Sequence, residues 1–264
     1  MGRTITLAQA PILSFLSSSH HKKPRAIKNG PLVLCVHNQP TSNHDQTLKF
    51  DRRDNNIATE SKTIYHDNWL ENIAISYITK TIADTAGIKN DVKGYKGLVM
   101  VSEEMFQKFS PIESRQIVIK ALESIIPPFS LHMIRELTPQ SKFTREFFAI
   151  ITTLAFGWLV GPGEVRESEL EGRKERNVVH ITKCRFLEES NCLGMCTNLC
   201  KMPTQDFFRK NFKTPINMVP KFDDMSCEMI FGQHPPAQED DPAFKQPCYK
   251  LCNVKRRHSE ICVR

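Results

Sequence analysis

The chain has 264 residues, 40% of them hydrophobic, so it is long and apolar enough to bury a core, which argues against a wholly disordered protein. Its formal net charge is +7, but five basic residues and no acidic residue lie within residues 1–44, and subtracting these five leaves about +2 for the rest. The chain shows no stripe of basic and aromatic residues, no phosphate-binding loop and no nucleophile motif, which argues against nucleic-acid-binding, kinase and hydrolase functions.

Residues 1–60 are predicted to be a transit peptide followed by a disordered linker. The leader combines serines and scattered apolar residues with cations, and its first carboxylate is Asp45. This composition is typical of import into an organelle, whereas a secretory signal needs a longer uninterrupted apolar core. The polar stretch that follows has no sustained period and indicates a linker. Composition alone does not distinguish a plastid from a mitochondrion.

Two capping boxes predict amphipathic helices in the region 61–176, which we expect to be helical. In the first, Asn68 caps the helix and Glu71 reaches back to it, and apolar residues follow at spacings of three and four. In the second, Ser110 and Glu113 take these positions with a proline at the first helical residue, and the helix is expected to stop at the next pair of prolines. A shorter helix is expected between the two.

The segment 147–160 carries no charge and is mostly large and apolar. It is shorter than the about 20 residues that a bilayer-spanning helix needs, so the favoured interpretation is a helix buried on all sides in the core. In a further interpretation, part of it lines an apolar pocket or makes a peripheral contact with a membrane. The candidates for such a pocket are Phe147, Phe148, Phe156 and Trp158, although such aromatic residues more often form plain core.

The next stretch, residues 164–176, is dense in charges of both signs. Carboxylates and cations at spacings of three and four residues are typical of a solvated helix, so a helix is predicted here.

Eight of the nine cysteines lie between Cys184 and Cys262. In a reducing organelle, such density favours thiolates on a metal over disulfides. Three of them lie four residues apart and would place their sulfurs on one face if the segment is helical. The pair at residues 248 and 252 is expected to close the ligand shell from a second segment. The candidate metal ligands are Cys184, Cys192, Cys196, Cys200, Cys227, Cys248 and Cys252.

The spacing of these cysteines does not identify the metal. It matches neither the ferredoxin pattern nor the paired knuckles of structural zinc. Soft thiolates suit iron–sulfur clusters, iron–thiolate centres, zinc or copper(I). Disulfides and unligated thiols also remain open as alternatives.

The predicted fold is mainly α, with a helical N-terminal half packed against a cysteine-rich, loop-rich, metal-binding C-terminal half, residues 177–264. Prolines recur throughout the C-terminal half. Because proline disfavours helix interiors and central strands, short helices and loops are expected there. A bound metal would supply the cohesion that such a region lacks.

Three runs of this half resemble the plant β-carotene isomerase family of strigolactone biosynthesis. The first, residues 178–205, contains CLGMCTNLC from Cys192 to Cys200. The second, residues 220–233, contains DMSCEM around Cys227, and the third is residues 239–248. The similarity extends from about residue 65 to residue 252.

The resemblance implies an iron-containing chloroplast enzyme, stromal or membrane-associated, that interconverts all-trans- and 9-cis-β-carotene. Its implied cofactor is iron, as an iron–sulfur cluster or an iron–thiolate centre held by the cysteines of the matching motifs, and no catalytic residue is implied. The implied partners are a carotenoid substrate and carotenoid cleavage enzymes. A redox-active centre can lower the bond order of a polyene, whereas zinc cannot change valence. The alternative is a non-catalytic plastid scaffold that binds zinc or an iron–sulfur cluster through thiolates.

Overall fold

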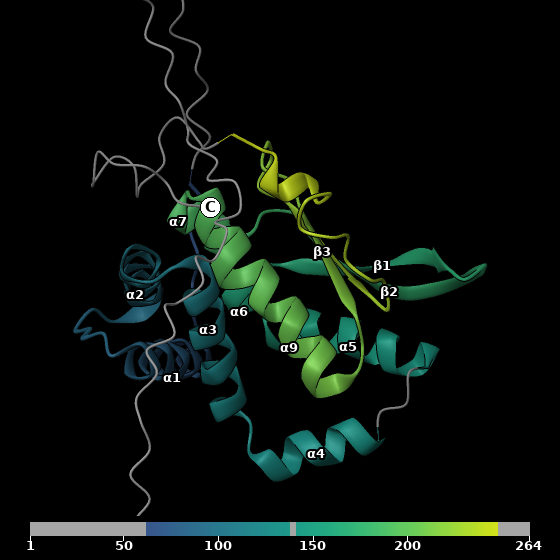
Figure 1. Ribbon diagram of the computed structural model, residues 1–264, viewed down its shortest axis with the longest axis horizontal. Helices are drawn as coiled ribbons and strands as arrows, with labels where there is room; N and C mark the ends of the chain where they lie inside the picture. Colours follow the sequence, from purple (N-terminus) through teal and green to yellow (C-terminus); the bar gives the residue numbers. More distant parts are fainter. Residues whose placement is uncertain (1–61, 138–140, 248–264) are drawn as a thin grey trace, which may run out of the picture. The chain divides into compact units, whose positions relative to one another are not determined.

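In the computed structural model, the described residues are 62–137 and 141–247, and within them most helices lie to one side of a small antiparallel sheet, whose β1–β2 hairpin extends away from them (Figure 1). The predicted transit peptide and linker, and Cys248 and Cys252, therefore lie outside the described residues. The helices are α1 (Trp69–Ala86), α2 (Gly94–Lys108), α3 (Pro111–Ile125), α4 (Pro128–Leu137), α5 (Lys142–Ala155), α6 (Gly157–Val160), α7 (Arg185–Ser190), α8 (Leu193–Met195), the π-helix η1 (Cys196–Lys201), α9 (Met202–Phe212) and the 3₁₀-helix η2 (Pro242–Phe244). The strands are β1 (Gly163–Leu170), β2 (Arg173–Ile181), β3 (Ile216–Pro220) and β4 (Cys227–Phe231).

Both predicted capping boxes are confirmed. The Glu71 amide donates to Asn68 Oδ1 at 3.0 Å, and the Asn68 amide donates to Glu71 Oε2 at 2.7 Å. At the start of α3, the Ser110 amide likewise donates to Glu113 Oε2 at 2.9 Å. The prolines after α3 end it as expected, but they also open α4, which the sequence analysis did not predict.

The helix predicted over residues 164–176 is wrong, because this segment forms β1, the turn after it and the start of β2. The two strands pair antiparallel, with Leu170 opposite Arg173. Glu171 and Gly172 between them have φ values of 51° and 74°, as in the two-residue turns whose twist suits a hairpin. The boundary expected after residue 176 therefore falls inside β2.

The C-terminal half is not the set of short helices and loops that its prolines suggested, since it contains α9 and two strands. The strand order is β1-β2-β4-β3, so β4 is a central strand. Pro203 lies in the first turn of α9, and Pro220 ends the edge strand β3. Both are positions that tolerate proline. The mainly α fold is thus confirmed, with the addition of a four-stranded sheet.

Helix α5 is buried on one side only, so the prediction of a helix buried all round is wrong. Phe148 and Ala149 face the sheet, where Phe148 joins an aromatic cluster with Phe208, Phe212 and Phe231. The opposite side of the helix is exposed.

Among the described helices, none is by itself long and apolar enough to span a bilayer, although the bent pair α3–α4 passes that test on length and composition.

Candidate cysteine-lined site

Four cysteine side chains line one small cavity. They come from the start of α7 (Cys184), from η1 (Cys196 and Cys200) and from the start of β4 (Cys227), and all four are free thiols. The cavity has a free volume of about 10 Å³, close to the minimum that holds one water molecule. It therefore has room for a group the size of an ion. The other lining residues are Val160, Ile181, Leu187, Lys201, Met218 and Pro220.

The sheet and a π-helix bring these four sulfurs together. Ile181 of β2 lies opposite Cys227 of β4, and the Cys184 amide donates to the Met225 carbonyl at 2.7 Å. Cys196 and Cys200 lie in η1, where hydrogen bonds join residues five apart, so residues four apart still face nearly the same way. Such π-helical turns are frequent at functional sites.

Burial keeps the four thiols protonated. It raises the pKa of the Cys184, Cys196 and Cys227 thiols, and raises the pKa of Cys200 to about 12. Neighbouring thiols raise the pKa of Cys196 and Cys227 further, whereas the Lys201 ammonium lowers it. Because the thiolate is the metal-binding form, ligation here requires a cation that outweighs burial.

Lys201 contributes the only ammonium among the residues that line this cavity. It forms an ion pair with Asp241, and the two side chains are 2% and 4% exposed. Asp241 also accepts a hydrogen bond from the Ala243 amide at 3.0 Å. The pair therefore ties the segment around η2 to the helix that carries two of the cysteines.

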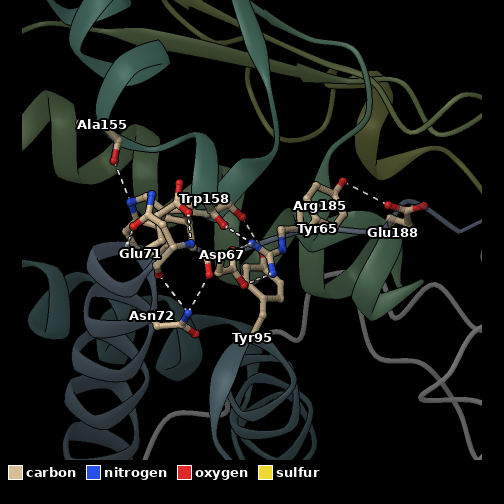
Figure 2. A network of polar contacts seen from close by, with 11 residues as sticks. Tyr65, Asp67, Glu71, Asn72, Tyr95, Ala155, Trp158, Arg185 and Glu188 are labelled. Atoms are coloured by element: carbon tan, nitrogen blue, oxygen red, sulfur yellow. Dashed lines mark hydrogen bonds and ion pairs between the residues drawn. The ribbon is translucent and has the colours of Figure 1, made fainter.

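Arg185, next to Cys184, anchors the N-terminal end of the described chain (Figure 2). Its guanidinium donates to both carboxylate oxygens of Asp67, at 2.5 and 2.7 Å, and to the Trp158 carbonyl at 2.9 Å. It also lies over the rings of Tyr65 and Tyr95, 4.5 and 3.9 Å from their centroids. The network thus holds α6, α7 and residues 65–67 together beside the cavity.

The structure brings together four of the seven predicted ligands. Cys192 is fully buried but is not among the residues that line the cavity. It caps α8 in an extended conformation, so it precedes the helical turn on which three sulfurs were expected. Cys248 and Cys252, expected to close the shell, lie outside the described residues. Sequence reasoning missed Lys201 and Asp241, for which the only signal was a lysine adjoining a cysteine.

The donor set fits a thiolate-bound metal in kind and number, but not yet in spacing. Within residues 62–137 and 141–247, no three His, Cys, Asp or Glu side chains approach closely enough to form a metal-binding group. Four thiols nevertheless line the same cavity, and Cys184 and Cys200 both raise the pKa of Cys196 and of Cys227. The two observations differ because lining a common cavity is a looser condition than ligand distance. Metal ligation in this cavity would therefore require the sulfurs to move closer together.

Comparisons with known proteins agree on one family. The family model for the C-terminal part of D27-like β-carotene isomerases matches residues 158–240, which include all four cavity cysteines. A Medicago truncatula protein named "Beta-carotene isomerase D27, chloroplastic" is 53% identical over 200 residues, 76% of this chain and 79% of that protein. An Arabidopsis thaliana protein of the same name is 38% identical over 261 residues, 98% of each chain. No solved structure matches the chain.

Proposed function

Because the chain belongs to the β-carotene isomerase D27 family and is thus a chloroplast carotenoid isomerase, we propose that it interconverts all-trans- and 9-cis-β-carotene. In this proposal it acts in strigolactone biosynthesis and passes its product to carotenoid cleavage enzymes. The observation that carries the proposal is the convergence of four thiols on one cavity inside the segment that matches the family.

The proposed cofactor is iron, held by Cys184, Cys196, Cys200 and Cys227. Rotation about a double bond of a polyene requires a temporary loss of π-bond order. Iron held by thiolates would supply a one-electron exchange with the conjugated system, which zinc cannot because its valence is fixed.

The residues of the chain would set the conditions for this chemistry. The apolar lining, with Val160, Leu187 and Met218, keeps water away from the sulfurs. Lys201 holds a positive charge beside the thiols, and Asp241 fixes the position of that charge. The cavity itself is too small for a carotenoid, so the polyene would lie beside it.

Replacing Cys196 with serine tests this assignment. Anaerobically purified full-length protein should contain iron and show sulfur-to-iron charge-transfer absorption, and its carotene isomer ratio should change with time by chromatography. The Cys196→Ser variant should lose the iron, the absorption and the turnover. Cys192 is also buried but does not line the cavity, so the Cys192→Ser variant should keep all three.

Circular dichroism of both variants would separate loss of metal from loss of fold. Full activity in a folded Cys196→Ser protein would refute the site assignment. A wild-type protein that binds metal but leaves isomer ratios unchanged would instead support a scaffold role.

A further inference from the structure

One side of α5 exposes a continuous row of large apolar side chains to solvent. We define this outer face as Phe143, Phe147, Ile150, Ile151, Leu154 and, at the end of the helix, Phe156. Their exposed fractions range from 37% to 78%. At about 200 Å² for a fully exposed large side chain, the face amounts to about 600 Å² of mainly apolar surface. That is the upper end of what a typical monomer exposes in one patch.

The outer face has no packing role within the described residues, because the opposite side of α5 makes the contacts with the sheet. Thr144, Phe148, Ala149 and Thr152 are buried on the side that packs against β1, β2 and β4. The helix is held in place at its first turn, where Arg145 donates two hydrogen bonds to Glu175 at 2.6 and 2.7 Å. The outer face is therefore a fixed surface and not a loosely attached segment.

The chemistry of the outer face suits hydrocarbon better than protein. It contains no tyrosine, tryptophan or arginine, which are the residues enriched among the energetic hot spots of protein interfaces. The neighbouring Thr153 hydroxyl is already used, since it donates to the Ala149 carbonyl at 3.0 Å. Lys142, whose side chain is 54% exposed, stands at one end, and its ammonium also donates to the Lys174 carbonyl at 3.0 Å and lies 3.7 Å from the Glu146 carboxylate. An apolar helix face with a cation at its margin is typical of a helix that lies in a membrane interface.

The outer face also leads to the cysteine-lined cavity. Phe156 ends α5 and begins α6, and Val160 at the end of α6 lines the cavity. β-Carotene is a hydrocarbon with no polar group, so it resides in lipid and not in water. A helix that lies in the lipid surface and continues into the site would spare the substrate a passage through water.

We propose that the outer face of α5 docks the enzyme on the surface of a lipid bilayer, with the helix lying in the plane of the interface. This inference rests on the proposed function for the choice of lipid as the partner.

Flotation of full-length protein with phosphatidylcholine vesicles tests the docking. Neutral lipid is chosen because the first 44 residues carry five cations and no carboxylate, and would bind anionic lipid by themselves. The wild type should float with the vesicles. The double variant Ile150→Asp, Leu154→Asp should partition at least about tenfold less, since two apolar side chains that would be buried in the lipid become charged.

Ile112→Asp is the matched control, because Ile112 is an isoleucine on α3 with 67% exposure. It should float as the wild type does. Equal flotation of the double variant and the wild type, or no flotation of the wild type, would overturn the proposal. A wild-type dimer in size-exclusion chromatography that the double variant converts to a monomer would assign the face to a second copy of the chain, and would also overturn it.

A second measurement avoids the risk that two aspartates disturb the fold. In vesicles of brominated phosphatidylcholine, the added fluorescence of Leu154→Trp should be quenched, and that of Ile112→Trp should not. Equal quenching at both positions would contradict docking through α5. Neither measurement depends on turnover: an inactive chain that floats would refute the proposed function alone, and an active chain that does not would refute this inference alone.

Discussion

Replacing Asp67 with asparagine tests whether its ion pair with Arg185 holds residues 62–68 on the folded core. The Arg185 side chain is 5% exposed and donates to both oxygens of the Asp67 carboxylate. Asparagine can accept through one oxygen only, and it leaves the guanidinium buried without a counter-charge. The change alters no side-chain volume, so the loss of stability reports on the ion pair.

The expected loss follows from the burial of the two partners. Removing one partner of a buried ion pair costs about 3–5 kcal/mol. Asp67 is 17% exposed, and Arg185 keeps the Trp158 carbonyl and two tyrosine rings. The lower end, about 3 kcal/mol, is therefore expected. For a folded part of this size, the midpoint of thermal unfolding should fall by about 6–12 °C.

Urea and thermal denaturation followed by circular dichroism measure this loss. Lys62→Met is the control, because the Lys62 side chain in its pair with Glu189 is 61% exposed. An exposed pair contributes little, so this variant should differ from the wild type by less than about 0.5 kcal/mol. A loss below about 1 kcal/mol for Asp67→Asn, or one equal to that of the control, would refute the anchoring role.

Three further changes have expected outcomes. Two hydrogen bonds from Arg145 hold the pKa of the Glu175 carboxyl below its usual value, so its contribution to stability is present above about pH 4 and is lost as the pH falls through the lowered pKa. Glu175→Gln should lower the free energy of unfolding by about 3 kcal/mol at neutral pH, and urea titrations should show the difference from the wild type closing below about pH 4. A Cβ added at Gly194 would lie 2.6 Å from Phe106 Cζ, so Gly194→Ala should lower the free energy of unfolding by about 1–3 kcal/mol. Adding Phe106→Leu should restore part of this stability, and a double variant no more stable than the single variant would contradict the prediction. Lys201→Met removes the counter-charge of the buried Asp241 carboxylate and should lower the free energy of unfolding by about 3–5 kcal/mol in urea denaturation. A loss under about 1 kcal/mol would show that the ion pair does not stabilise the fold.

The parts of the fold that were predictable are those encoded within four residues along the chain. Asn68 with Glu71, and Ser110 with Glu113, form capping boxes because each pair needs only the geometry of one helical turn. Periodicity was less informative about which side is buried. In α1, Ile78 is buried while Tyr77, which fits the same apolar spacing, is 53% exposed. The side that is buried depends on where α2 and α3 lie, which local spacing does not specify.

The β1–β2 hairpin was missed because the dense mixed charges of residues 164–176 favoured a helix and hid the two-residue period of a strand. Along β1, partly buried and exposed residues mostly alternate, a period of two that the mixed charges of residues 164–176 obscured. The remaining local signal was Glu171-Gly172, where both residues adopt positive φ. Glycine suits that conformation and glutamate does not, so only one of the two turn positions carries a residue type that indicates the turn.

The convergence of the cysteines depends on this missed sheet. On a helix, the spacing within one segment decides which sulfurs are neighbours, and this spacing predicted that Cys192, Cys196 and Cys200 lie together. The structure instead joins η1 to Cys184 and Cys227, which are 43 residues apart in the sequence. These two come together because β2 pairs with β4 and places Ile181 opposite Cys227. Partners across a sheet are set by the register between distant strands, so the composition of the site follows from the pairing of β2 with β4 and not from the spacing of the cysteines.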